Sequence, residues 1–181
     1  GVPNVVNAHP HSTEIVSVVH NGIIENSDEI KKELEKKGLK FKSQTDTEVI
    51  TLLITEALKK SEPLESVYDT LKKLKGSFAL GIIFKNHKDF IIGARRGSPL
   101  AVGYSTQENY LGSDSYALKS MTNKISYLDD GDLCVLSKDK IEFYNSNKKK
   151  INKKVHTLSD DENTTDKGDY KNFMLKEIFE Q

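Results

Sequence analysis

Between residues 27 and 76 the apolar positions recur every three or four residues, which is the spacing of one face of a helix. The second of these segments opens with the sequence TDTE, which has the form of a capping box. A glycine follows the first and third segments and marks their ends. The pattern therefore predicts three helices, over residues 28–37, 45–58 and 63–74.

The rest of the chain changes to short runs rich in β-branched and aromatic residues, separated by turn-forming residues. These runs, with one earlier segment, predict strands over residues 14–20, 78–84, 90–94, 100–104, 110–112, 124–128, 132–136 and 140–144. A short helix is predicted over 115–121 and a final one from Tyr170 onward. Clustered helices followed by closely spaced strands favour an α+β fold with antiparallel pairing.

Length and charge narrow the possible classes of protein. The 181 residues suit one domain, or one domain with a tail. The 27 basic and 27 acidic side chains cancel, so there is no global field to attract nucleic acid or an anionic membrane. No run of 18 apolar residues and no signal peptide is visible. The single cysteine, Cys134, excludes an internal disulfide and a Cys-rich zinc site, and indicates a reducing cytoplasm.

Two histidine motifs stand near the N-terminus. His9 and His11 flank a proline, but no third ligand lies at metal-binding spacing, so a positioning role for His9 is favoured over a metal site. His20 precedes Asn21 and Gly22 at the end of a predicted strand. An Asn amide and a Gly backbone N–H can form an oxyanion hole, whereas the spacing alone favours a hairpin turn.

Three other candidates have structural alternatives. Asp46 lies at a helix start, where it can compensate the helix dipole or bind an ammonium group; the sequence does not choose. Arg95 and Arg96 precede a turn without the glycine-rich loop of a phosphate site, which favours a structural role. Cys134 lies in an apolar run without an adjacent base, and is interpreted as a small buried hydrophobe.

Several motifs together resemble the glutaminase domain of class II glutamine amidotransferases, which are N-terminal-nucleophile hydrolases. They are NAHPH at residues 7–11, VVHNGIIEN at 18–26, TDTEVI at 45–50, GSFA at 76–79, ARRGSPL at 94–100, GSD at 112–114 and DGD at 130–132. The resemblance implies a four-layer αββα sandwich of two antiparallel sheets. It also implies hydrolysis of glutamine to glutamate and ammonia, with no cofactor and no metal.

The resemblance assigns roles to residues of this chain. The side chain of Asn21 and the backbone N–H of Gly22 match the oxyanion hole. Asp46 matches the carboxylate that holds the α-amino group of glutamine. His9 and His20 fall in motifs that line or support the substrate pocket. The nucleophile of the family is an N-terminal cysteine, and this chain has Gly1 at its start.

The KEIFEQ motif at residues 176–181 narrows the resemblance to members that pass ammonia to fructose 6-phosphate and make glucosamine 6-phosphate. For these members a homo-oligomer is expected. We therefore expect residues 1–181 to be a partial amidotransferase domain, without the nucleophile segment and the sugar-phosphate isomerase domains, and inactive alone. Two alternatives stay open, namely the glutaminase domain of another class II amidotransferase and a degenerate, non-catalytic glutamine-binding or interaction domain.

Overall fold

A computed structural model describes residues 4–158 of the chain. The predicted helices form close to their expected positions. Their apolar faces are buried, as with Ile30 and Leu34 in the first long helix. The helices are η1 (Val5–Asn7), α1 (Ser27–Lys36), α2 (Thr47–Ala57), α3 (Pro63–Leu71) and α4 (Ser115–Leu118). The helix predicted from Tyr170 onward lies outside the described residues.

The strands form two antiparallel sheets, one of seven strands in the order β1-β2-β3-β4-β8-β9-β10 and one of four in the order β11-β7-β5-β6. The α+β class and the antiparallel pairing are therefore confirmed. The strands are β1 (His11–Ser12), β2 (Val16–Ile24), β3 (Gly76–Phe84), β4 (His87–Arg96), β5 (Ala101–Tyr104), β6 (Asn109–Gly112), β7 (Lys124–Tyr127), β8 (Leu133–Ser137), β9 (Ile141–Tyr144), β10 (Lys150–Ile151) and β11 (His156–Thr157).

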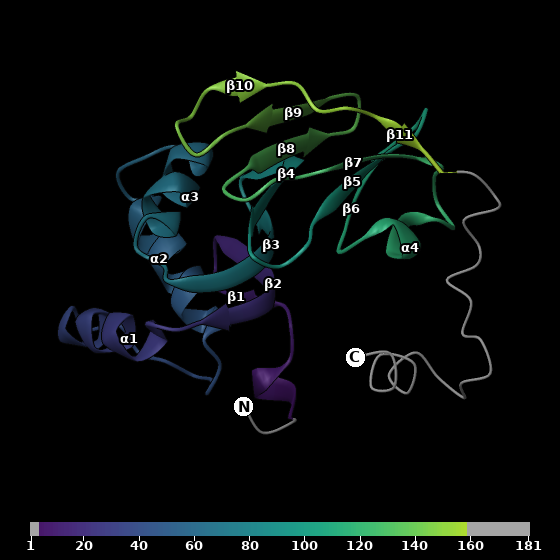
Figure 1. Cartoon of the computed structure of the whole chain (residues 1–181). Helices are drawn as coiled ribbons and strands as arrows, with labels where there is room; N and C mark the ends of the chain where they lie inside the picture. Colours follow the sequence, from purple (N-terminus) through teal and green to yellow (C-terminus); the bar gives the residue numbers. More distant parts are fainter. Residues whose placement is uncertain (1–3, 159–181) are drawn as a thin grey trace, which may run out of the picture.

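The elements stack in layers, which Figure 1 shows from the helices through the two sheets to α4. The largest core joins the helices to the large sheet and includes Ile50 and Leu80. A second core, with Leu100 and Leu136, lies between the two sheets. A third, around Leu118, joins α4 to the outer face of the small sheet. Three successive cores agree with the predicted αββα order, although the described part of the outer helical layer is only α4.

The Asn21-Gly22 pair does not form the hairpin turn that its spacing favoured. Strand β2 continues through both residues and pairs with β3 over its whole length, from Val16 opposite Phe84 to Ile24 opposite Gly76. Gly22 has a φ of 134°, a conformation that glycine adopts without the steric cost of a side chain. The prediction of a turn was wrong because nine cross-strand pairs outweigh the local preference of two residues.

The capping box predicted at the start of α2 does not form either. The helix begins at Thr47, two residues later than expected. The Glu48 carboxylate accepts hydrogen bonds from the backbone N–H groups of Lys42 and Ser43, at 2.8 and 2.6 Å, instead of bonding to Thr45. Glu48 therefore holds the loop that leads into α2, and this loop becomes one wall of the candidate site.

Candidate functional site

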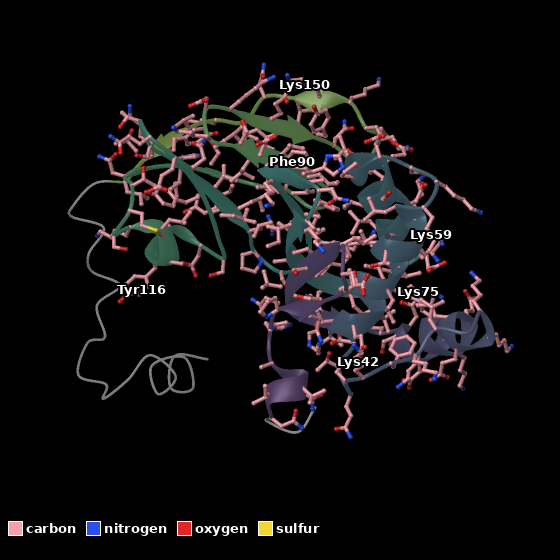
Figure 2. The ribbon with its side chains drawn as sticks, turned by 180° about the vertical axis from the view of Figure 1, so that it is seen from behind. Lys42, Lys59, Lys75, Phe90, Tyr116 and Lys150 are labelled. Carbon is pink, nitrogen blue, oxygen red and sulfur yellow. The ribbon has the colours of Figure 1, made fainter. Side chains whose placement is uncertain are left out.

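A pocket of about 410 Å³ lies where the start of α2 meets strand β2. Lys42, labelled in Figure 2, marks the loop that precedes this end of α2. Four of the five site residues predicted from the sequence line the pocket. The lining residues are His9, His20, Gly22, Ile23, Ile24, Ser27, Gln44, Thr45, Asp46 and Thr47.

Asp46 joins the helix to the strand instead of capping the helix. It occupies the N-cap position of α2, but its side chain makes no cap hydrogen bond. Its Oδ2 atom accepts the backbone N–H of Ile24 at 2.7 Å, and its Oδ1 atom lies 4.0 Å from Nδ1 of His20. The side chain is 28% exposed. The side chain therefore makes no cap bond, its position at the start of α2 still suits dipole compensation, and it stays partly exposed in the pocket wall.

The hydroxyl of Thr47 connects two histidines in the pocket. Its Oγ1 atom lies 3.1 Å from Nε2 of His9 and 3.1 Å from Nδ1 of His20. Burial lowers the pKa of His20 below its ordinary value of 6.5, and the Asp46 carboxylate and the Ser77 carbonyl oppose this only in part. His20 is therefore neutral near pH 7, so that hydrogen bonding and not charge determines its orientation.

His11 lies beside this group but bonds elsewhere. Its Nε2 atom is 2.9 Å from Oγ1 of Thr45, and its ring meets that of His9 edge-on at a centroid distance of 5.4 Å. Burial, and then the neighbouring His9 ring, lowers the pKa of His11. Within residues 4–158 no group of three or more His, Cys, Asp or Glu side chains is placed to hold a metal ion.

Asn21 lies on the other face of β2 from the pocket at Asp46. Side chains alternate along a strand, and His20 is buried toward the helices while Asn21 is exposed. Asn21 lines a second pocket of about 270 Å³ between the sheets, together with Leu111 and Ser113. His20 borders both pockets, so residues 20–22 of β2 separate two hollows that open on opposite faces of the strand.

The edge of β2 that faces α2 is open beside Gly22. Strand β1 pairs only with Ser17 and Val18, so the next six residues of β2 have no strand partner on that side within the described part of the chain. The backbone N–H of Ile24 points to this edge and is bound by Asp46. Hydrogen-bonding direction alternates along a strand, which places the N–H of Gly22 on the same edge.

Space around Gly22 is closed to any larger residue. A Cβ atom at this position would lie 2.3 Å from the carbonyl oxygen of Ser77. The positive φ and this close approach both require glycine. In the sequence, Asn21-Gly22 indicates a turn. In the structure, the glycine is instead needed because the backbone of β2 runs close to β3 at this point.

The structural interpretations of the arginines and the cysteine agree with their contacts. Arg95 donates to the carbonyl oxygens of Ser98 and Leu128, and Arg96 donates to those of Leu71, the last residue of α3, and Leu74. Cys134 is fully buried, and burial raises the pKa of its thiol to about 12. Neither arginine lines the pocket at Asp46, and the thiol is inaccessible and protonated.

Sequence reasoning missed the two threonines that flank Asp46. Thr45 binds His11 and Thr47 binds His9 and His20, across separations of 27 to 38 residues along the chain. The only local signal was the alternation of threonine and acidic residues in TDTE, which was interpreted as a cap. Contacts of such long range have no signature in the spacing of residues.

Comparison with known proteins places the chain in a family. Residues 7–120 match the model of a glutamine amidotransferase domain. The glutamine–fructose-6-phosphate aminotransferase (isomerizing) of Zymomonas mobilis is 49% identical over the whole chain, and that of Mesorhizobium japonicum is 47% identical. The chain spans 30% of the length of each of these relatives.

Solved structures agree in fold. The glutamine phosphoribosylpyrophosphate amidotransferase of B. subtilis matches 79% of this chain and 32% of its own, with a TM-score of 0.64 and 23% identity. A second structure, described as the allosteric regulatory enzyme of purine biosynthesis, matches 74% of this chain and 29% of its own with a TM-score of 0.60. At 23–24% identity these matches speak for the fold alone. From the family model, the chain belongs to the glutamine amidotransferase domain family.

Proposed function

We propose that the pocket at the start of α2 binds glutamine and that Asp46 receives its α-ammonium group. The observation that supports this proposal is the hydrogen bonding and exposure of the Asp46 carboxylate. One oxygen is occupied by the N–H of Ile24, while the side chain stays partly exposed in the pocket and makes no cap bond. A charge-assisted hydrogen bond to such an anion selects an amino acid by its ammonium group.

The proposed reaction is hydrolysis of the side-chain amide of glutamine to glutamate and ammonia. Negative charge develops on the amide oxygen when a nucleophile attacks the carbonyl carbon. The side chain of Asn21 and the N–H of Gly22 are the proposed donors to this oxygen. Gly22 lines the pocket at Asp46 and Asn21 lines the pocket on the other face of β2, so the proposal requires the amide end of glutamine to lie at the edge of β2 between the two. Because Cys134 is buried and protonated, we assign the nucleophile to no residue of this chain.

We further propose fructose 6-phosphate as the acceptor of the ammonia in the full-length gene product. The named relatives at 49% and 47% identity are glutamine–fructose-6-phosphate aminotransferases, and their similarity extends over the whole chain. The product would be glucosamine 6-phosphate, formed by a homo-oligomer. An assay with several acceptors tests this step, and ammonia transfer to another acceptor with none to fructose 6-phosphate would contradict it.

The role of Asp46 is tested by comparing glutamine with glutaramate, which is glutamine without its α-amino group. The wild-type full-length gene product should prefer glutamine in kcat/KM by about tenfold to hundredfold, the range of a charge-assisted hydrogen bond. Asp46→Asn should lose most of this preference, mainly through a higher KM for glutamine, while its kcat/KM for glutaramate stays within about threefold.

Asp139→Asn is the matched control, because Asp139 is an exposed aspartate in the turn between β8 and β9. This control should keep the wild-type preference for glutamine. A preference that survives in Asp46→Asn would show that another group binds the ammonium, and the assignment would then be wrong.

A further inference from the structure

The hydroxyl of Thr47 has one proton to donate and lies beside two histidine nitrogens. Its Oγ1 atom lies 3.1 Å from a nitrogen of His9 and 3.1 Å from a nitrogen of His20, both within hydrogen-bonding distance. Thr47 is 2% exposed, so water does not replace either partner easily. The nearest carboxylate is that of Asp46, whose Oδ1 atom lies 4.0 Å from the same nitrogen of His20.

A hydroxyl donates one hydrogen bond and accepts through its lone pairs. Where the Thr47 hydroxyl donates to one of these histidine nitrogens, that nitrogen is bare, while the other carries a proton and donates to the hydroxyl. A neutral imidazole has one proton on its two ring nitrogens. The tautomers of His9 and His20 are therefore linked through Thr47, although the two rings belong to segments on either side of β1.

The surroundings of His20 indicate the direction of this chain of bonds. The Asp46 carboxylate favours a proton on Nδ1, the nitrogen that faces it. Nε2 of His20 has no hydrogen-bond partner among the described residues, and the Ser77 carbonyl also favours protonation of the ring, so the contact that selects Nδ1 for the proton is the one with Asp46. Nδ1–H of His20 then donates to Thr47, and the Thr47 hydroxyl donates to Nε2 of His9.

We propose that Thr47 is a positioning residue, whose hydroxyl holds the Nδ1 proton of His20 away from the Asp46 carboxylate. Without this hydroxyl, Oδ1 of Asp46, at 4.0 Å from Nδ1, becomes an acceptor for that proton. A hydrogen bond from His20 would then occupy the oxygen that, under the function proposed above, receives the ammonium of glutamine. Thr47 in this way keeps the ammonium site open.

The test uses Thr47→Val and Thr47→Ser in the full-length gene product. Valine has nearly the same shape without the hydroxyl, and serine keeps the hydroxyl. Thr47→Val should raise the KM for glutamine about fivefold to tenfold, the loss of about one hydrogen bond, with kcat changed less than about threefold. Its KM for glutaramate should change less than that for glutamine, and Thr47→Ser should restore the wild-type KM.

Thr51→Val is the matched control. Thr51 lies one turn further along α2 and is equally buried, but among residues 4–158 its hydroxyl hydrogen-bonds only to the backbone carbonyls of His11 and Thr47. This variant should keep the wild-type KM. A rise in KM equal to that of Thr47→Val would mean that any buried hydroxyl of α2 has this effect, and it would overturn the proposal.

Nitrogen-15 NMR of labelled histidine in the wild-type protein gives a readout that does not depend on activity. We expect the Nδ1–H tautomer for both histidines, with Nε2 of each ring bare. The Nε2–H tautomer for either ring would overturn the proposal, even if Thr47→Val fails to fold. A wild-type protein with the expected tautomers but no glutamine hydrolysis would instead contradict the proposed function alone.

Discussion

At the scale of single residues, His20 shows burial and charge acting in opposite directions. Burial disfavours the imidazolium, and the neighbouring carboxylate of Asp46 favours it, with a net lowering of the pKa of His20 below 6.5. The unfolded chain therefore binds a proton at a higher pH than the native protein does. Protonation favours the unfolded state, so this histidine contributes stability above pH 6.5 that is lost as the pH falls through its native pKa.

We predict that the free energy of unfolding decreases as the pH falls below about 6.5, in part because of His20 and His11, whose pKa values are both lowered. Urea denaturation between pH 8 and pH 5 measures this dependence. His20→Gln should flatten the slope below pH 6.5, whereas His156→Gln, at an exposed position, should leave it unchanged. An identical slope in all three proteins would contradict the linkage.

Some residue roles followed from the sequence and others did not. The apolar neighbours of Cys134 predicted a buried thiol, and the structure confirms this. Local spacing left the role of Asp46 undecided, and it gave no sign of the hydrogen bond to Ile24, 22 residues away. Thr47 was missed altogether, since both of its histidine partners come from other elements.

At the scale of elements, β2 determines the geometry of the candidate site. Its backbone continues through Asn21 and Gly22, so that successive residues border hollows on opposite faces of the large sheet. The helices were predicted well because their apolar periodicity is local. Strands β1, β10 and β11 were missed because two residues each carry no pattern, and they form only by pairing with a neighbour.

Gly22→Ala should test how tightly β2 lies against β3. The new Cβ would meet the Ser77 carbonyl oxygen at 2.3 Å and would also force an unfavourable φ, so we expect a loss of at least about 3 kcal/mol of stability. Gly38→Ala is the control, because Gly38 also has a positive φ but no atom within 4 Å of the Cβ position. It should cost only about 1–2 kcal/mol.

Urea denaturation of both glycine variants separates the cost of the unfavourable backbone conformation from the cost of the steric clash with Ser77. Equal losses for Gly22→Ala and Gly38→Ala would show that backbone conformation alone accounts for the effect. The close approach of Gly22 to Ser77 would then not constrain the strand.

At the scale of the whole molecule, two sheets and a helical layer bring the two pockets to one segment of β2. The order of helices and strands along the chain predicted the α+β class. It did not predict that β4 pairs with β8, while the intervening strands β5, β6 and β7 form a second sheet. Such pairing depends on cores shared by distant segments, and the resemblance to a known family supplied what periodicity could not.

Both the family membership and the described geometry point to Asn21 as the residue to test. The family model covers β2 and α2, and the structure places Asn21 beside a hollow between the sheets. No helix within residues 4–158 is long and apolar enough to cross a membrane. The chain spans 30% of the length of its named relatives, so activity is best measured on the full-length gene product.

The most direct measurement is therefore the release of glutamate from glutamine by the full-length gene product, as wild type and as Asn21→Ala. We predict that the wild type turns over and that the variant loses about 10²–10³-fold in kcat, or about 2.7–4 kcal/mol of transition-state stabilisation, with little change in KM. Asn86→Ala, in the exposed turn between β3 and β4, should keep the wild-type rate. A wild type that releases no glutamate, or an Asn21→Ala variant as fast as the wild type, would contradict the account.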